Sequence, residues 1–255
     1  MNGIKKTLAL LLSVMLLVGT LASCDMIPTG GQDDVDTSSY TARVNIKFAT
    51  DDDKMKSAVD AMSASSVIKV SGDDISVSTT STTGLATVSE EYILVSDMLY
   101  YGLSVSVGDV SSAEYKRAPF GESRRLELIS ATFGGAQIDN GSFSEVIVMD
   151  GQNGTGYTCS GISDGAREYL EGVMNDKLGG LATVRIDDAY LDLETKGTAT
   201  VSSVLSCNYV ITMGGVEYTV TMRLYTEYDY ECETVVSAPG DTGKYVSVSS
   251  EEILK

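Results

Sequence analysis

The chain has 255 residues, with 18 lysines and arginines against 36 aspartates and glutamates, a formal net charge of −18, and no histidine. A negative field of this size repels phosphate backbones, so nucleic acid is not expected as a partner. Since histidine is the commonest general base and a common metal ligand, its absence argues against an enzyme, and no catalytic residue, metal or cofactor is predicted.

The first 23 residues have the parts of a secretory signal peptide. Lys5 and Lys6 give a positive start, residues 8–18 form an uncharged apolar run, and small residues follow. Because a helix needs about 20 apolar residues to cross a bilayer, this run is too short to stay as a transmembrane anchor. An ordinary secreted protein, with a cysteine near the cleavage site by chance, is the alternative.

The residues Leu21-Ala22-Ser23-Cys24 resemble the bacterial lipobox. The resemblance implies cleavage before Cys24, whose thiol then carries a diacylglyceryl group. Two acyl chains hold a protein stably on a membrane. We therefore expect an extracytoplasmic protein on the outer face of the cytoplasmic membrane, which is the cell surface in a single-membrane host. Asp25 resembles the inner-membrane retention signal of double-membrane bacteria.

Residues 24–39 are predicted to be a flexible acidic tether, because they contain proline, glycines and four aspartates but almost no large apolar group. Such a segment would hold the following domain roughly 20 Å from the anchor. Residues 40–255 are expected to form a single β-rich domain, since a chain of this length can bury a sizeable core. Removing residues 1–23 takes away two lysines and no acid, which leaves a net charge of −20.

Alternation of apolar and polar residues predicts strands over much of the first half. The first begins at Tyr40 and directs Ala42, Val44, Ile46 and Phe48 to one face. A meander with polar turns follows. Its expected strands are Val67–Ser71, Ile75–Thr82, Leu85–Val95 and Met98–Val107.

Between the first strand and the meander, Thr50 and the acidic residues 51–53 are typical of a helix start. Whether residues 51–63 are helix or strand is left open. A calcium site is not favoured there, because three consecutive aspartates lack the ligand spacing and the glycine of a calcium loop. If the segment is a helix, one apolar face carries Met55, Ala58, Val59 and Met62.

The middle of the chain predicts a helix at Glu122–Ala131 and then a hairpin of Phe143–Met149 with Thr155–Ile162. Gly161-Ile162-Ser163-Asp164-Gly165 fits the G-x-S-x-G motif of hydrolases. That serine needs a histidine to accept its proton, and the chain has none. We therefore interpret Ser163 or Asp164 as the N-cap of a helix over Asp164–Leu178.

The last third predicts three long strands, Leu181–Glu194, Thr198–Met213 and Val216–Cys232, with Gly214-Gly215 as a two-residue hairpin loop. Pairing Met213 with Val216 places apolar residues opposite one another on a single face. The predicted pairs are Ile211 with Tyr218, Tyr209 with Val220, Cys207 with Met222, Leu205 with Leu224, and Val201 with Tyr228.

Once Cys24 is acylated, an odd number of cysteines remains: Cys159, Cys207 and Cys232. None shows the C-x-x-C spacing of a zinc or redox site. We expect buried thiols, with a single disulfide as the alternative.

A lipobox cysteine, an acidic tether, meandering strands, a helix and long C-terminal strands together resemble the half-barrel lipoproteins of the LolA and LppX/LprG type over residues 40–250. The C-terminal part of the likeness is Tyr225-x-x-Tyr228-x-Tyr230 and Pro239-x-Asp241-x-x-x-Tyr245. The resemblance implies a β-dominated α+β fold, in which a curved antiparallel sheet, the half-barrel, has two or three helices on its concave face. It also implies a cavity for acyl chains between sheet and helices.

Two functions are expected for this cell-envelope lipoprotein, neither of them enzymatic. The first is binding of a lipid or other hydrophobic ligand on the concave face, and the alternative is a structural or surface protein-interaction role with no small ligand. Carboxylates such as Asp187-Asp188 are adjacent on a strand, so they are not expected to share a substrate. Carboxylates far apart in the sequence can still converge in space, as glycosidase pairs do, which keeps an enzyme as a third hypothesis. Oligomeric state is left open. The ligand-facing candidates are Leu205, Tyr209, Val220, Met222, Leu224 and Tyr228.

Overall fold

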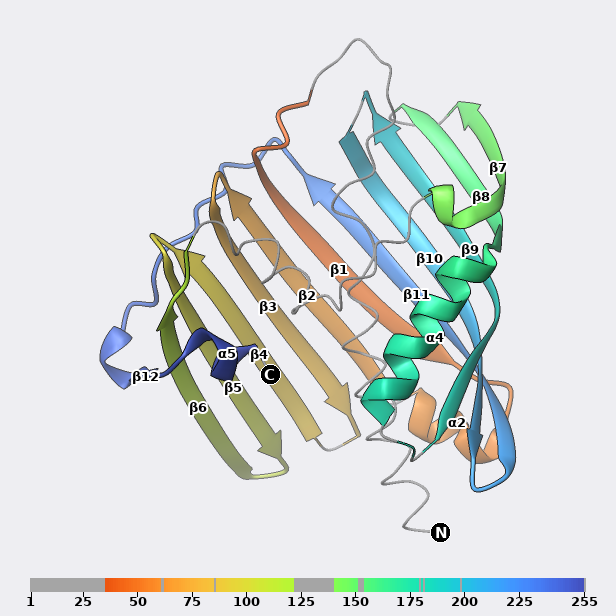
Figure 1. Ribbon diagram of the computed structural model, residues 1–255, viewed down its shortest axis with the longest axis horizontal. Coiled ribbons are helices and arrows are strands. Elements are labelled where there is room, and N and C mark those ends of the chain that lie inside the picture. Colours follow the sequence, from red (N-terminus) through yellow and green to blue (C-terminus); the bar gives the residue numbers. More distant parts are fainter. Residues whose placement is uncertain are drawn as a thin grey trace.

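The computed structural model describes residues 35–60, 62–84, 86–121, 140–150, 154–178, 180, 182–197 and 199–254. Within these residues, 12 strands form one sheet in the order β12-β6-β5-β4-β3-β2-β1-β11-β10-β9-β8-β7. Neighbouring strands are antiparallel, except that β12 runs parallel to β6. Figure 1 shows a large, open, curved sheet. The predicted β-dominated α+β class is confirmed.

The elements have the following bounds. The strands are β1 Ser39–Ala49, β2 Met62–Ser71, β3 Asp74–Thr83, β4 Ala86–Val95, β5 Met98–Val107, β6 Val110–Pro119, β7 Phe143–Asp150, β8 Thr155–Ile162, β9 Thr183–Lys196, β10 Ala199–Met213, β11 Val216–Asp229 and β12 Val246–Ser247. The helices are α2 Asp53–Val59, α4 Asp164–Leu178 and α5 Ser250–Ile253, with short 3-10 turns η3 Asn140–Ser142 and η4 Thr242–Lys244.

Two antiparallel meanders, β1 to β6 and β7 to β11, meet where β1 pairs with β11. At this seam Ala42 is opposite Tyr228 and Ile46 is opposite Leu224. On its other side β1 pairs with β2. The first strand of the chain therefore lies in the middle of the sheet and joins the two halves.

We call the face that carries the even-numbered residues of β1 the inner face, and the other the outer face. Alternation along β1 is as predicted, because Ala42, Val44, Ile46 and Phe48 are buried. They belong to a core that also includes residues of β2, β3 and β8 to β11, with Met55 and Val59 of α2 and Leu170 of α4. A smaller core of Leu94, Leu99, Ala118 and Phe120 is covered by Ile253 of α5.

The predicted meander is confirmed in β2 to β5, with two differences. β2 begins at Met62 instead of Val67, because small residues at 63–66 conceal an alternation in which Met62, Ala64 and Ser66 are buried. β6 was not predicted. Most of its residues are exposed, so it has no apolar period for sequence reasoning to detect.

Residues 51–63, left open above, divide into helix and strand. Asp52 accepts backbone hydrogen bonds from Met55 and Lys56 at the start of α2. The hydroxyl of Thr50 accepts from the Asp52 amide and donates to the Thr219 carbonyl, which ties the helix start to β11. Met62 does not share the helix face as expected, since it opens β2.

The hairpin of β10 and β11 has the predicted register. Met213 is opposite Val216, and the pairing continues in step to Ser202 opposite Glu227, so four of the five predicted pairs are present and the pair of Val201 with Tyr228 lies beyond the paired residues. Gly214 and Gly215 have φ values of 59° and 78°. Both values suit the type I′ turn, which side chains disfavour.

The predicted helix over Asp164–Leu178 is α4. The hairpin of Phe143–Met149 with Thr155–Ile162 is confirmed as β7 and β8, whereas the helix expected at Glu122–Ala131 lies outside the described residues. Cys159 and Cys207 are buried, Cys232 is half-buried, and none of the three is in a disulfide. Among the helices described, none is long and apolar enough to cross a bilayer.

Leu224→Ala tests the core on β11. Leu224 is 1% exposed, so its truncation should lower the free energy of unfolding by about 2–5 kcal/mol. Val216→Ala is the matched control on the same strand, because Val216 is 50% exposed and its loss should matter little. Chemical denaturation measures both. Equal effects of the two substitutions would contradict the burial of Leu224.

Candidate functional site

The structure brings the six ligand-facing candidates together on the inner face, mostly as core residues. Tyr228 is half-buried, and the other five are at most 3% exposed. Burial raises the pKa of Tyr209, and the pKa of the neighbouring Cys207 thiol rises to about 12. This thiol therefore stays protonated and unreactive at neutral pH. The buried candidates are Leu205, Tyr209, Val220, Met222 and Leu224.

Tyr228 belongs to a cluster of three tyrosines at the seam. Its ring stacks on Tyr230 at a centroid distance of 6.0 Å and meets the edge of Tyr40 at 5.9 Å. The hydroxyl of Tyr230 donates to the Thr200 carbonyl at 2.9 Å. These contacts tie β1 to β11 and β10, which is a structural role.

Ser163 of the G-x-S-x-G motif is the N-cap of α4, as predicted. Its hydroxyl accepts a hydrogen bond from the Ala166 amide, and its carbonyl accepts one from the Arg167 amide. Cys24, the predicted lipidation residue, lies outside the described residues.

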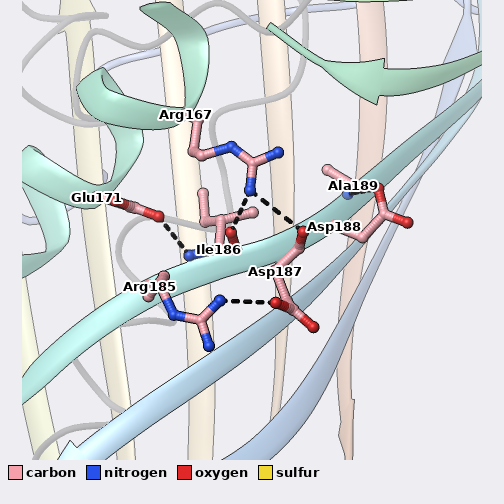
Figure 2. A network of polar contacts seen from close by, with 7 residues as sticks. All are labelled: Arg167, Glu171, Arg185, Ile186, Asp187, Asp188 and Ala189. Carbon is pink, nitrogen blue, oxygen red and sulfur yellow. Dashed lines mark hydrogen bonds and ion pairs between the residues drawn. The ribbon is translucent and has the colours of Figure 1, made fainter. Parts of the chain in front are cut away.

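A polar network joins α4 to β9 (Figure 2). Arg167 donates to the carbonyls of Ile186 and Asp187 at 2.7 and 3.2 Å, and Glu171 accepts from the Ile186 amide at 2.6 Å. Asn175 bonds both the amide and the carbonyl of Val184. Each of these contacts is to strand backbone, so the helix side chains take the place of a neighbouring strand.

The reason is local to β9. β8 pairs with β9 only over residues 191–195, so the first half of β9 has a free edge on that side. A bulge also occurs there, since the register with β10 shifts between Asn208 and Tyr209. Asp187 is the extra residue, and it forms an exposed ion pair with Arg185 at 2.7 Å. Asp187 and Asp188 therefore lie at a β-bulge.

The carboxylate of Glu90, on the inner face of β4, accepts hydrogen bonds from two tyrosine hydroxyls. Tyr92 and Tyr101 donate to the same oxygen of Glu90, at 2.9 and 3.0 Å. Burial and this carboxylate raise the pKa of both phenols. Neither hydroxyl is therefore an activated acid or base at neutral pH.

The outer face of the first meander carries an accessible polar site. Register places Ser78, Glu91, Gly102 and Tyr115 side by side across β3 to β6. Because Gly102 has no side chain, the ring of Tyr115 lies over it, and a Cβ there would be 3.4 Å from that ring. A hollow of about 290 Å³ remains beside the ring. It is lined by Ser78, Thr79, Thr80, Ser89, Glu90, Glu91, Gly102, Leu103, Ser104 and Tyr115.

A second hollow, of about 420 Å³, adjoins it and shares Glu91. One wall is the outer face at Lys69, Ser76 and Ile93, and the other is residues 235–245, which follow β11. Figure 1 shows this segment passing around the β6 end of the sheet before α5. We call the two together the outer hollow.

Three tyrosines contact one another at the outer hollow. The ring of Tyr245 lies 5.4 Å from Tyr100 and 5.3 Å from Tyr115. Lys244 places its ammonium 3.8 Å from the centre of the Tyr115 ring, a cation–π contact. Burial and then the charge of Glu91 raise the pKa of Tyr245, so this phenol is a neutral hydrogen-bonding group. Ser78 donates to Glu91 at 3.2 Å.

The side chains that line the outer hollow are suited to binding a polar ligand. It offers hydroxyls, carboxylates, the ammonium groups of Lys69 and Lys244 and the aromatic rings of Tyr115 and Tyr245, which form hydrogen bonds or stacking contacts. No group of histidine, cysteine, aspartate and glutamate with the arrangement of a metal site occurs among the described residues.

No protein-family model matches the chain, and no curated protein matches it. Among solved structures, the ywiB protein from Bacillus subtilis matches with 10% sequence identity and a TM-score of 0.24, over 78% of this chain and 98% of that chain. A likeness this weak carries no argument about fold or function. The function proposed below therefore rests on residues of this chain.

Sequence reasoning did not find the outer hollow. Tyr100 lay on a predicted strand, but Tyr115 lies on β6, which was not predicted. Tyr245 was noted only within a pattern of residues that resembles the half-barrel lipoproteins. Gly102, inside an otherwise regular strand, was the available signal, because such a glycine often marks a close approach.

Asn175→Leu tests the role of α4 as a substitute strand. The change leaves the amide and carbonyl of Val184 unpaired, which should cost about 1–3 kcal/mol of stability for each group that stays buried. Hydrogen exchange at the Val184 amide should accelerate accordingly. Glu168→Gln on an exposed position of α4 is the control. Unchanged protection of Val184 in Asn175→Leu would refute this role.

Proposed function

We propose that this protein is a lipid-anchored cell-envelope protein that binds a neutral glycan in the outer hollow, without catalysis. The observation that carries the proposal is the half-buried Tyr115 ring beside a row of hydroxyls and the carboxylate of Glu91. A sugar ring has an apolar C–H face that stacks on an aromatic ring and hydroxyls that bond to polar side chains. The outer hollow supplies the hydroxyls directly, and it supplies the stacking face once the Lys244 ammonium, 3.8 Å from the centre of the Tyr115 ring, moves off the side that Gly102 does not cover.

Charge narrows the class of glycan. The chain carries a formal net charge of −18, so phosphate-rich or uronate-rich polymers are repelled. Neutral saccharides are not repelled by this net negative charge. The proposal is a form of the surface-interaction role expected from sequence, with a glycan as the partner instead of a protein.

The other function expected from sequence, an apolar ligand on the inner face, has less support. Five of its six candidate residues are at most 3% exposed and pack in the main core. A ligand on these residues would have to displace core side chains, at a cost comparable to opening a cavity.

We also propose the finer fold description, a half-barrel with its helices on the concave side. Its support is that α2, α4 and α5 each add a buried side chain to a core formed by the inner face: Met55, Leu170 and Ile253. Attachment to the membrane rests on the lipobox-like residues that end at Cys24.

Cys24→Ala tests the anchor. Without the thiol no diacylglyceryl group can be attached, so the protein should appear in soluble or uncleaved form and keep its fold. Cell fractionation with mass analysis of the N-terminus measures this, and Cys232→Ser is the control because Cys232 is not part of the lipobox-like residues. A Cys24→Ala protein that matures normally and stays on the membrane would rule the anchor out.

Tyr115→Ala tests the binding site. Titration of the detergent-solubilised full chain with cellohexaose and chitohexaose should show binding to at least one of them. The substitution should weaken this binding about tenfold or more, which corresponds to about 1.4 kcal/mol. Tyr115→Phe should retain most of the affinity, because the stacking ring stays.

Tyr225→Ala is the matched control for Tyr115→Ala, since Tyr225 is a half-buried tyrosine on β11, distant from the outer hollow. Thermal unfolding confirms that each variant is folded. If the parent chain binds no neutral oligosaccharide, or if Tyr115→Ala binds as well as the parent, the proposal fails.

A further inference from the structure

The two end strands of the sheet differ in how their edges are protected. β6 carries Lys116, Arg117 and Pro119, and β12 pairs with it at Lys116 and Arg117. Charged residues, proline and a covering strand are the usual protections of a sheet edge. β7, at the other end, has no lysine, arginine or proline, and none of the described strands pairs with its far side.

β7 is also apolar on both faces. Four consecutive residues are well exposed: Val146 by 41%, Ile147 by 61%, Val148 by 60% and Met149 by 49%. The end strand of a sheet normally exposes polar side chains on at least one face. An edge of this kind is a template for pairing with another strand.

The sequence of β7 is symmetric about Ile147. Val146-Ile147-Val148 reads the same in both directions, with polar residues at 144–145 and 150 on either side. A strand that pairs with its own copy in antiparallel orientation needs this kind of symmetry, because a two-fold axis places the same surface on both partners. The strand therefore suits a second copy of itself.

Backbone geometry limits how two copies can pair. Amide and carbonyl groups point alternately to the two sides of a strand, so residues opposite one another must both use the same side. For two identical strands, opposite residues then differ by an even number, and the axis passes through a residue. An axis at Ile147 pairs seven residues and places Val146 opposite Val148 and Ile147 opposite Ile147.

Charge agrees with this register. With the axis at Ile147, Glu145 is opposite Met149 and Asp150 is opposite Ser144, so no two carboxylates face each other directly. An axis at Val146 would instead place Glu145 opposite Ile147, and Val146 would no longer be opposite Val148. The Ile147 register thus matches β-branched residues with one another, a favourable pairing across strands.

We propose that two copies of this chain pair through β7 in antiparallel orientation, about a two-fold axis at Ile147, to form a continuous sheet. The apolar residues on both faces of β7 become cross-strand neighbours. Because each chain is strongly acidic, added salt should favour the dimer by screening the repulsion between copies.

Disulfide capture of Ile147→Cys in the full chain tests the register. Opposite Cα atoms of paired strands are about 4.5–5.5 Å apart, within the reach of a disulfide. Oxidation in intact cells should give a dimer at twice the chain mass on a non-reducing gel, which reductant converts back. Val146→Cys and Val148→Cys should each cross-link poorly alone and well when expressed together.

All variants carry Cys232→Ser, because that thiol is half-buried, and the parent with this change shows the background from other cysteines. Ile147→Lys should lower the dimer fraction of the otherwise unmodified chain at least tenfold in sedimentation, since two ammonium groups would meet at the axis. Equal cross-linking at positions 146, 147 and 148, capture of a different protein in place of the dimer, or a monomer at all salt concentrations would overturn the proposal.

Discussion

The backbone hydrogen bonds of an open sheet are the constraint on which this structure depends. Every strand with a free edge has amides and carbonyls that need partners. Along the first half of β9, Arg167, Glu171 and Asn175 of α4 supply those partners. At β6 a parallel strand of two residues does so, and α5 follows it on the inner face. The positions of both helices thus follow from the edges that the strands leave.

The two faces of the first meander have different roles because strand residues alternate. Ile75, Leu94 and Leu99 point inward and build the cores, so the outward positions are free of packing demands. Hydroxyl side chains occupy many of these outward positions. Because Gly102 has no side chain, the Tyr115 ring lies directly against the strand there. A polar hollow lined by an aromatic ring can form there without any cost to the core.

The sequence predicted those elements in which apolar residues recur with the period of a strand or a helix. The register of β10 with β11 followed from apolar alternation and from Gly214-Gly215, which allow only one pairing that keeps the apolar side chains on one face. It could not predict β6, whose residues are mostly polar on both faces, nor the contact of Tyr115 with Tyr245, which lie far apart in the chain. The bulge at Asp187 has no local signature either, so the polar network of α4 required the structure.

The seam between β1 and β11 sets the order of events as the chain folds. Each meander is made of neighbours in sequence and can form early, but β1 must wait for β11 before its second edge is paired. Until then Val44, Ile46 and Phe48 lie on a strand with one open edge, which exposes the chain to aggregation. Among the strand pairs described, β1 with β11 joins the residues farthest apart in the sequence, so loop-closure entropy favours the completion of the sheet as a late event in folding.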